Sequence, residues 1–155
     1  MIVPSLFISP NGKPFSSSQG QTQPDPIEEE SLSGKRVVIV EDEAMTQMHL
    51  RKIVTRAGMQ VVSYALNGTE GAAVVLRERP DLVLMDINMP GGMTGLEAAR
   101  TILAQYPVCI VMITAYQDFR QEAEELGACG YAIKPIESAT LLPELQRAWK
   151  RFLKR

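Results

Sequence analysis

Asp86 is the residue of this sequence best placed to do chemistry, because it directly follows an apolar run at residues 82–85. An unbroken apolar run of this length is typical of a parallel strand that is buried on both faces. Glu41 and Asp42 directly follow a second such run, at residues 37–40. Open α/β sheets place their functional groups at the carboxyl ends of the strands. We therefore expect three carboxylates to meet at one edge of a sheet.

A hydroxyl and an ammonium group follow two further apolar runs. Thr114 comes after residues 108–113, and Lys134 comes after residues 131–133 and before Pro135. Three neighbouring carboxylates repel one another, and a divalent cation removes that conflict. Mg²⁺ prefers oxygen ligands and is commonly held by carboxylates together with phosphate oxygens. With a lysine and a hydroxyl to contact phosphoryl oxygens, this set of groups suits phosphoryl transfer onto a carboxylate.

The order and spacing of these residues resemble the receiver domain of bacterial two-component signalling, the family of CheY-like response regulators. In that family an acidic pair follows the first strand and the phosphoacceptor Asp follows the third. Ser or Thr follows the fourth strand and Lys-Pro follows the fifth. The matching positions here are Glu41-Asp42, Asp86, Thr114 and Lys134-Pro135. The resemblance covers residues 34 to about 152, and it is specific because separated features occur in the right order.

The resemblance implies that Asp86 accepts a phosphoryl group, with Lys134 and Thr114 as the other catalytic groups. Thr114 and Tyr131 would form the conformational switch. A histidine kinase or a histidine phosphotransfer protein would be the donor, and an unknown protein partner would respond to the phosphorylated form. The chain would thus be a signalling domain that catalyses only its own phosphorylation and dephosphorylation, rather than an enzyme acting on other substrates.

The resemblance also implies a Mg²⁺ site. Its ligands would be Glu41, Asp42, Asp86 and the backbone carbonyl of Asn88. Asp42 would be the stronger ligand of the acidic pair. Glu41 is longer than the Asp that is commoner at the first position, and it would act through water.

The chain pattern predicts an α/β fold in which strands and helices alternate around a parallel sheet. The resemblance implies a flavodoxin-like (βα)5 doubly wound sheet of strand order 2-1-3-4-5, in a single domain at residues 34–155. Expected strands are 35–40, 60–65, 81–86, 108–113 and 130–133; expected helices are about 43–57, 68–79, 95–105, 118–126 and 137–153. Asn67 and Thr94 have the residue types that cap helix N-termini. Residues 1–33 are rich in proline and serine, so we expect a disordered arm there.

Two segments depart from the family pattern. Gly91-Gly92 adds one residue to the loop after Pro90, and glycine adds backbone freedom, so we expect a more mobile loop. The segment from Thr114 to Lys134 is about two residues shorter than in CheY. We therefore expect the helix within it to be short, and the partner type and dimer mode do not carry over from the family.

Composition sets further limits on function. The formal net charge of −2 over 155 residues gives no indication of nucleic-acid binding. No apolar run approaches the roughly 18 residues that span a membrane, so we expect a cytoplasmic protein with no membrane contact. The last expected helix leaves no room for an effector domain after it, so we expect a stand-alone receiver. Cys109 and Cys129 are expected to be buried and reduced, with a redox pair as the less favoured alternative. The only histidine, His49, is expected to be a partly solvated helix residue.

Three alternatives remain open from the sequence. A haloacid dehalogenase-like phosphatase would need a second Asp two residues after its nucleophile, where this chain has Asn88. A flavodoxin-like cofactor binder would need a phosphate-binding loop where Glu41, Asp42 and Glu43 would repel phosphate. A receiver that has lost phosphorylation is disfavoured by the complete set of site residues.

Overall fold

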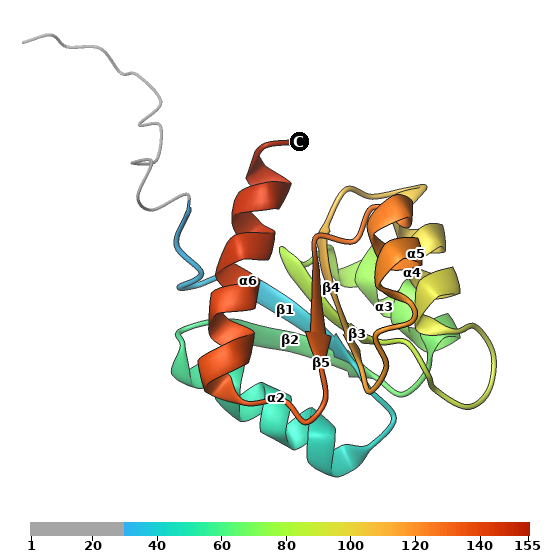
Figure 1. Ribbon diagram of the computed structural model, residues 1–155, viewed down its shortest axis with the longest axis horizontal. Coiled ribbons are helices and arrows are strands. Elements are labelled where there is room, and N and C mark those ends of the chain that lie inside the picture. The colour runs from blue at the N-terminus through green and yellow to red at the C-terminus, as the bar shows by residue number, and fades with distance from the viewer. Residues whose placement is uncertain (1–29) are drawn as a thin grey trace, which may run out of the picture.

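The computed structural model describes residues 30–155, so most of the expected arm at residues 1–33 lies outside the described residues. A five-stranded parallel sheet of order β2-β1-β3-β4-β5 forms the centre, as predicted. Helices α2 and α6 cover one face and α3, α4 and α5 cover the other (Figure 1). The strands are β1 (Arg36–Val40), β2 (Gln60–Ala65), β3 (Leu82–Asp86), β4 (Cys109–Thr114) and β5 (Gly130–Ile133). The helices are α2 (Ala44–Arg56), α3 (Gly68–Glu78), α4 (Gly95–Leu103), α5 (Arg120–Leu126) and α6 (Ser138–Leu153).

The sheet separates two hydrophobic cores. Every residue of β3 and of β4 is buried, which explains why these strands read as unbroken apolar runs. Successive side chains of a strand point to opposite faces, so Val38 packs with the helices of one face and Ile39 with those of the other. Across residues 30–155, no helix is long and apolar enough to cross a membrane.

The helix caps follow the sequence prediction, and the helix ends differ from it slightly. Asn67 Oδ1 accepts a hydrogen bond from Glu70 N at 2.8 Å, and Thr94 Oγ1 accepts one from Glu97 N at 3.2 Å. Helix α5 begins at Arg120, two residues later than expected, and has only 7 residues. The shortened segment before the last strand has therefore shortened this helix, as expected.

The loop that contains Gly91 and Gly92 contacts Thr69 of α3 at its C-terminal end. Both Gly91 and Gly92 have positive φ values, 79° and 74°. A Cβ on Gly92 would lie 2.4 Å from Thr69 Oγ1, and the same hydroxyl accepts a hydrogen bond from Met93 N at 3.1 Å. Glycine is thus required at position 92 both by its φ and by the closeness of α3.

Cys109 and Cys129 are both buried and free. A hydrogen bond from the Cys109 thiol lowers the pKa of Cys129 to about 7, while that bond and burial raise the pKa of Cys109. The favoured expectation, two buried and reduced thiols, agrees with the structure.

The folded region begins before the expected boundary at residue 34. Leu32 is only 8% exposed and belongs to the core between the sheet, α2 and α6. Its carbonyl accepts a hydrogen bond from Lys35 N, and Gly34 N donates to Gly58 O at 2.8 Å. Leu32 therefore contributes to the domain even though the surrounding sequence resembles the arm.

We predict that Leu32→Ala lowers the free energy of unfolding by about 2 kcal/mol, because buried Leu→Ala changes lose apolar burial and leave a cavity. Leu66→Ala is the matched control, since Leu66 is 55% exposed, and it should change stability by no more than about 0.5 kcal/mol. Urea unfolding followed by circular dichroism measures both. Equal stability of Leu32→Ala and the control would show that Leu32 packs too loosely to matter.

Candidate functional site

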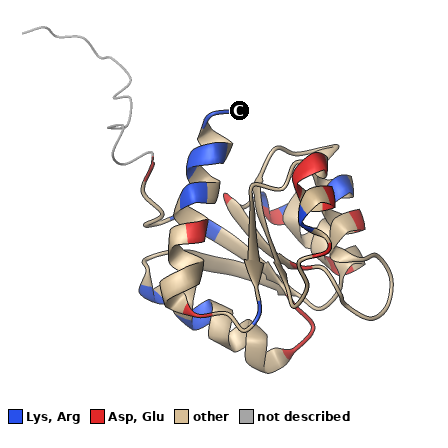
Figure 2. Cartoon of the chain, in the orientation of Figure 1, with Lys and Arg blue, Asp and Glu red and all other residues tan. Residues whose placement is uncertain are grey.

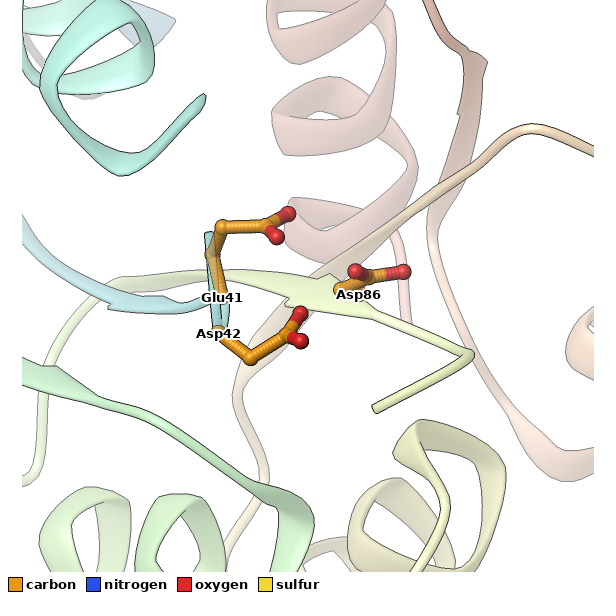
Figure 3. A group of neighbouring side chains, drawn as sticks. All are labelled: Glu41, Asp42 and Asp86. Atoms are coloured by element: carbon orange, nitrogen blue, oxygen red, sulfur yellow. The ribbon is translucent and has the colours of Figure 1, made fainter. Parts of the chain in front are cut away.

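Three carboxylates meet at the carboxyl edge of the sheet, as predicted. Glu41 and Asp42 follow β1 and Asp86 ends β3, and these neighbouring strands pair in a register that aligns Val40 with Met85. One carboxylate oxygen from each of the three residues lies within 4.8 Å of the others. Figure 3 shows the Glu41 and Asp42 side chains extending toward Asp86. Sheet register, rather than any local motif, brings the acidic pair to Asp86.

Lys134 joins the cluster from β5. Its Nζ lies 3.0 Å from Asp86 Oδ2 and 3.0 Å from Glu41 Oε2. Its backbone N donates to Thr114 O at 2.8 Å, and the peptide bond from Lys134 to Pro135 is cis. One ammonium group therefore faces three carboxylates, and the site keeps an excess of negative charge.

Of the carboxyl groups in the site, Glu41 is the one whose charged form is disfavoured by burial. Its side chain is fully buried, and this burial raises the pKa of Glu41 to about 7, although Lys134 acts in the opposite direction. The negative charge of Asp86 raises it further. Burial opposes the charge of Lys134 as well, but its two carboxylate partners outweigh that effect and raise the Lys134 pKa.

The donor set fits a divalent cation. Glu41 Oε2 is buried and has no well-aligned hydrogen bond from any described residue, so an oxygen ligand is left incompletely satisfied. Carboxylate oxygens are the ligands that Mg²⁺ prefers, and a second positive charge would relieve the repulsion among the acids. Glu41, Asp42 and Asp86 are the residues that would hold the ion.

Thr114 ends β4 beside this cluster. Its side chain is fully buried, and its Oγ1 accepts a hydrogen bond from Tyr116 N at 3.3 Å. In the β3–β4 register, Asp86 lies beside Ile113, which precedes Thr114 in the chain. The hydroxyl is thus placed at the same sheet edge as the carboxylates, as predicted.

Tyr131 lies in β5, three residues before Lys134, and its ring is buried in the core under α5. The Tyr131 hydroxyl donates to the carbonyl of Tyr116 at 2.5 Å, and the guanidinium of Arg120 lies 4.7 Å from the ring centroid. Tyr116 therefore contacts Thr114 through its N–H and Tyr131 through its carbonyl. This bridge was not predicted, because it depends on the path of the loop between β4 and α5.

Asn88 is exposed two residues after Asp86, and its backbone N donates to Asp86 Oδ1 at 3.2 Å. Both oxygens of Asp86 thus have a donor, Asn88 N on one and Lys134 Nζ on the other. His49 is an exposed residue of α2, and its Nε2 lies 2.6 Å from the carbonyl oxygen of Ile136. This agrees with the expectation of a partly solvated helix residue.

Residues 37–146 match the family model of the response regulator receiver domain. The chemotaxis protein CheY of Thermotoga maritima is 36% identical over 122 residues, which cover 76% of this chain and 99% of CheY. The transcriptional regulatory protein PdtaR of Mycobacterium tuberculosis is 35% identical over 120 residues, but only 58% of PdtaR is covered. The signal receiver domain of a modulated diguanylate cyclase from Desulfovibrio desulfuricans superimposes with a TM-score of 0.71 and 30% identity, over 79% of this chain and 100% of that chain.

The pKa of Glu41 predicts a pH dependence of the metal-free protein. Between the unfolded pKa of 4.5 and the folded pKa of about 7, the folded protein binds a proton that the unfolded chain has released. Stability should therefore fall as the pH rises through this window. Glu41→Gln removes the buried charge, so at pH 8 in EDTA it should be more stable than the wild type, by on the order of 2 kcal/mol.

At pH 4.5 the difference should nearly vanish, because Glu41 is then protonated in the folded state and half protonated in the unfolded chain. Glu125→Gln, at an exposed carboxylate of α5, is the control and should match the wild type at both pH values. Urea unfolding at the two pH values makes the measurement. A Glu41→Gln protein that is less stable at pH 8 would mean that the pair with Lys134 outweighs burial.

Proposed function

We propose that this chain, which belongs to the response regulator receiver family, accepts a phosphoryl group on Asp86 and signals through the change that follows. The observation that carries the proposal is the position of Lys134 Nζ, 3.0 Å from both Asp86 Oδ2 and Glu41 Oε2, in a cluster of three carboxylates. A purely structural carboxylate at a strand end would not need a second and a third acid beside it.

The chemistry follows from the groups around Asp86. A carboxylate oxygen of Asp86 attacks the phosphorus of the donor, and the bond from phosphorus to the donor's leaving group breaks as the acyl phosphate forms. The Asn88 N–H and Lys134 orient the carboxylate before the reaction. Lys134 then pairs with a phosphoryl oxygen. Glu41, Asp42, Asp86 and the Asn88 carbonyl would hold Mg²⁺, which would supply positive charge for the phosphoryl oxygens.

Thr114 and Tyr131 make the switch in this proposal. The Thr114 hydroxyl already accepts from Tyr116 N, and it can donate its own proton to a phosphoryl oxygen without losing that bond. Tyr116 in turn holds the Tyr131 hydroxyl, so phosphorylation would stabilise the buried position of the Tyr131 ring. The result is a shift of population between two states of the surface around α5 and β5.

The partners are proposed at the level of class. A shallow depression of about 540 Å³ beside Lys134 is lined by Met45, His49 and Ile136 among others, and Met45 is 85% exposed. An exposed apolar side chain in a depression that also includes Lys134 suits a protein donor such as a histidine kinase or phosphotransfer protein. The downstream partner is a protein rather than nucleic acid or membrane, and the proposed location is the cytoplasm.

Asp86→Asn should abolish phosphorylation, because an amide lacks the nucleophilic oxygen. Incubation with acetyl phosphate and Mg²⁺ should raise the intact mass of the wild type by one phosphoryl group, about 80 Da. The Asp86→Asn protein, and the wild type in EDTA, should stay unmodified. Asp118→Asn is the control at an exposed carboxylate and should be labelled like the wild type. Labelling of Asp86→Asn would remove Asp86 from its proposed role.

The lifetime of the phosphorylated form should depend on Tyr116, whose side chain is 55% exposed, two residues after Thr114. We expect its ring to cover the approach of water, while Asn88 can only orient water already admitted. The phosphorylated form should therefore persist for minutes or longer. Tyr116→Glu should lose phosphate about tenfold faster, equivalent to about 1.4 kcal/mol of barrier. Tyr116→Phe keeps the ring and should decay like the wild type.

Decay of the phosphorylated mass, or of a radiolabel, gives these rates directly. Wild-type decay within seconds, or slower decay of Tyr116→Glu, would show that Tyr116 does not shield the acyl phosphate.

A further inference from the structure

An apolar groove lies at the amino edge of the sheet, opposite the phosphorylation site. It has a volume of about 480 Å³ and is formed by the ends of α4, α5 and α6. Its walls include Leu103, Pro107, Leu126, Phe152 and Leu153, with Arg155 at the rim. The four large apolar side chains are each only partly buried. A cavity of this size has room for a few apolar side chains from another segment.

Glu30, the first residue that the structure describes, lies close to this groove. Gln146 Nε2 donates to Glu30 O at 2.8 Å, and Lys150 Nζ lies 3.9 Å from Glu30 Oε2. Gln146, Lys150 and Leu153 recur at helical spacing on one stripe of α6, and Leu153 is a wall of the groove. The rise from Gln146 to Leu153 is about 10 Å. The segment before Glu30 therefore starts within two helical turns of the groove.

Charge favours a path of that segment along the end of α6. Residues 28–30 are three consecutive glutamates, and the last turns of α6 carry Arg147, Lys150, Arg151 and Lys154. Figure 2 shows Lys and Arg positions, in blue, along the C-terminal half of α6. Arg147 and Arg151 already pair with Glu144, whereas Lys150 faces Glu30.

The sequence before Glu30 contains a suitable ligand. Ile2, Val3, Leu6, Phe7 and Ile8 make the first eight residues strongly apolar, and residues 9–29 are rich in polar residues, proline and glycine. A random-coil chain of roughly 20 residues would have a root-mean-square length of about 25 Å, so residues 9–29 are long enough to reach the groove. A tether of this reach raises the local concentration of the segment at the groove to the millimolar range.

We propose that residues 2–8 of this chain dock into the groove between α4, α5 and α6 of the same molecule. Phe7 and Leu6 are the anchors, because large apolar side chains gain most from burial against Leu103, Leu126 and Leu153. A second copy of the chain supplying the same segment is the competing occupant, and the test separates the two.

The test uses the full chain with a photoreactive benzoylphenylalanine in place of Phe7, and with the same probe in place of Phe15 as the matched control. After irradiation, mass spectrometry of peptides locates the cross-links. The expected result is a cross-link from position 7 to residues 103–108, 126–127 or 152–155 within one chain, with a yield unchanged on about tenfold dilution. The probe at position 15 should give little product at those residues.

A second pair of variants tests the groove itself. Leu126→Lys places a charge in the wall and should lower the yield from position 7 by at least about fivefold, the equivalent of losing roughly 1 kcal/mol of docking energy. Leu66→Lys, at an exposed site away from the groove, should leave the yield unchanged. Cross-links elsewhere, none at all, equal labelling from positions 7 and 15, or product linking two chains would each overturn intramolecular docking.

Discussion

The fold is organised around an excess of negative charge at one edge of a sheet. Three carboxylates share that edge with a single ammonium group, Lys134, and their mutual repulsion opposes the arrangement. The arrangement persists because its strands are fixed elsewhere: β3 and β4 are buried throughout and are covered on both faces. Rigid central strands therefore hold the acids together in a geometry that the acids alone would not adopt, and this is the condition for binding a cation and a phosphoryl group.

The ionisation of Glu41 depends directly on the charge balance of this site. A fully buried carboxylate whose pKa is raised to about 7 is close to losing its charge at neutral pH. Lys134 bridges Glu41 and Asp86 and partly compensates. A cation in the cluster would favour ionised Glu41 and would free Lys134 to meet an incoming phosphoryl oxygen. Metal binding, Glu41 ionisation and the availability of Lys134 are thus linked through one group of contacts.

Apolar runs predicted the strands and placed Asp86, Thr114 and Lys134 at strand ends, whereas the order of the strands followed from the resemblance to receiver domains. The positions of Asp86 and Lys134 could be predicted without knowing any side-chain contact. Contacts that depend on loop paths could not be predicted: the bridge through Tyr116, Arg120 over the Tyr131 ring and the late start of α5 all arise in one loop. Leu32 was missed for a different reason, since one apolar residue in a polar segment has no periodicity that reveals its burial.

Tyr131 lies on the edge strand β5, so a change in its position can alter the protein surface. Strand β5 pairs with β4 alone, so its outer edge would offer unpaired backbone groups. Side chains of α6 bind one backbone group of β5 and one just before it: Glu144 Oε1 accepts from Tyr131 N at 3.2 Å, and Arg151 Nη1 donates to Cys129 O at 2.9 Å. Side-chain contacts can rearrange at much lower cost than a ladder of strand hydrogen bonds, because water can replace each partner. A change at Tyr131 can therefore reach the faces of α5 and α6 while the three inner strands, β1, β3 and β4, and the acids at their ends keep their register.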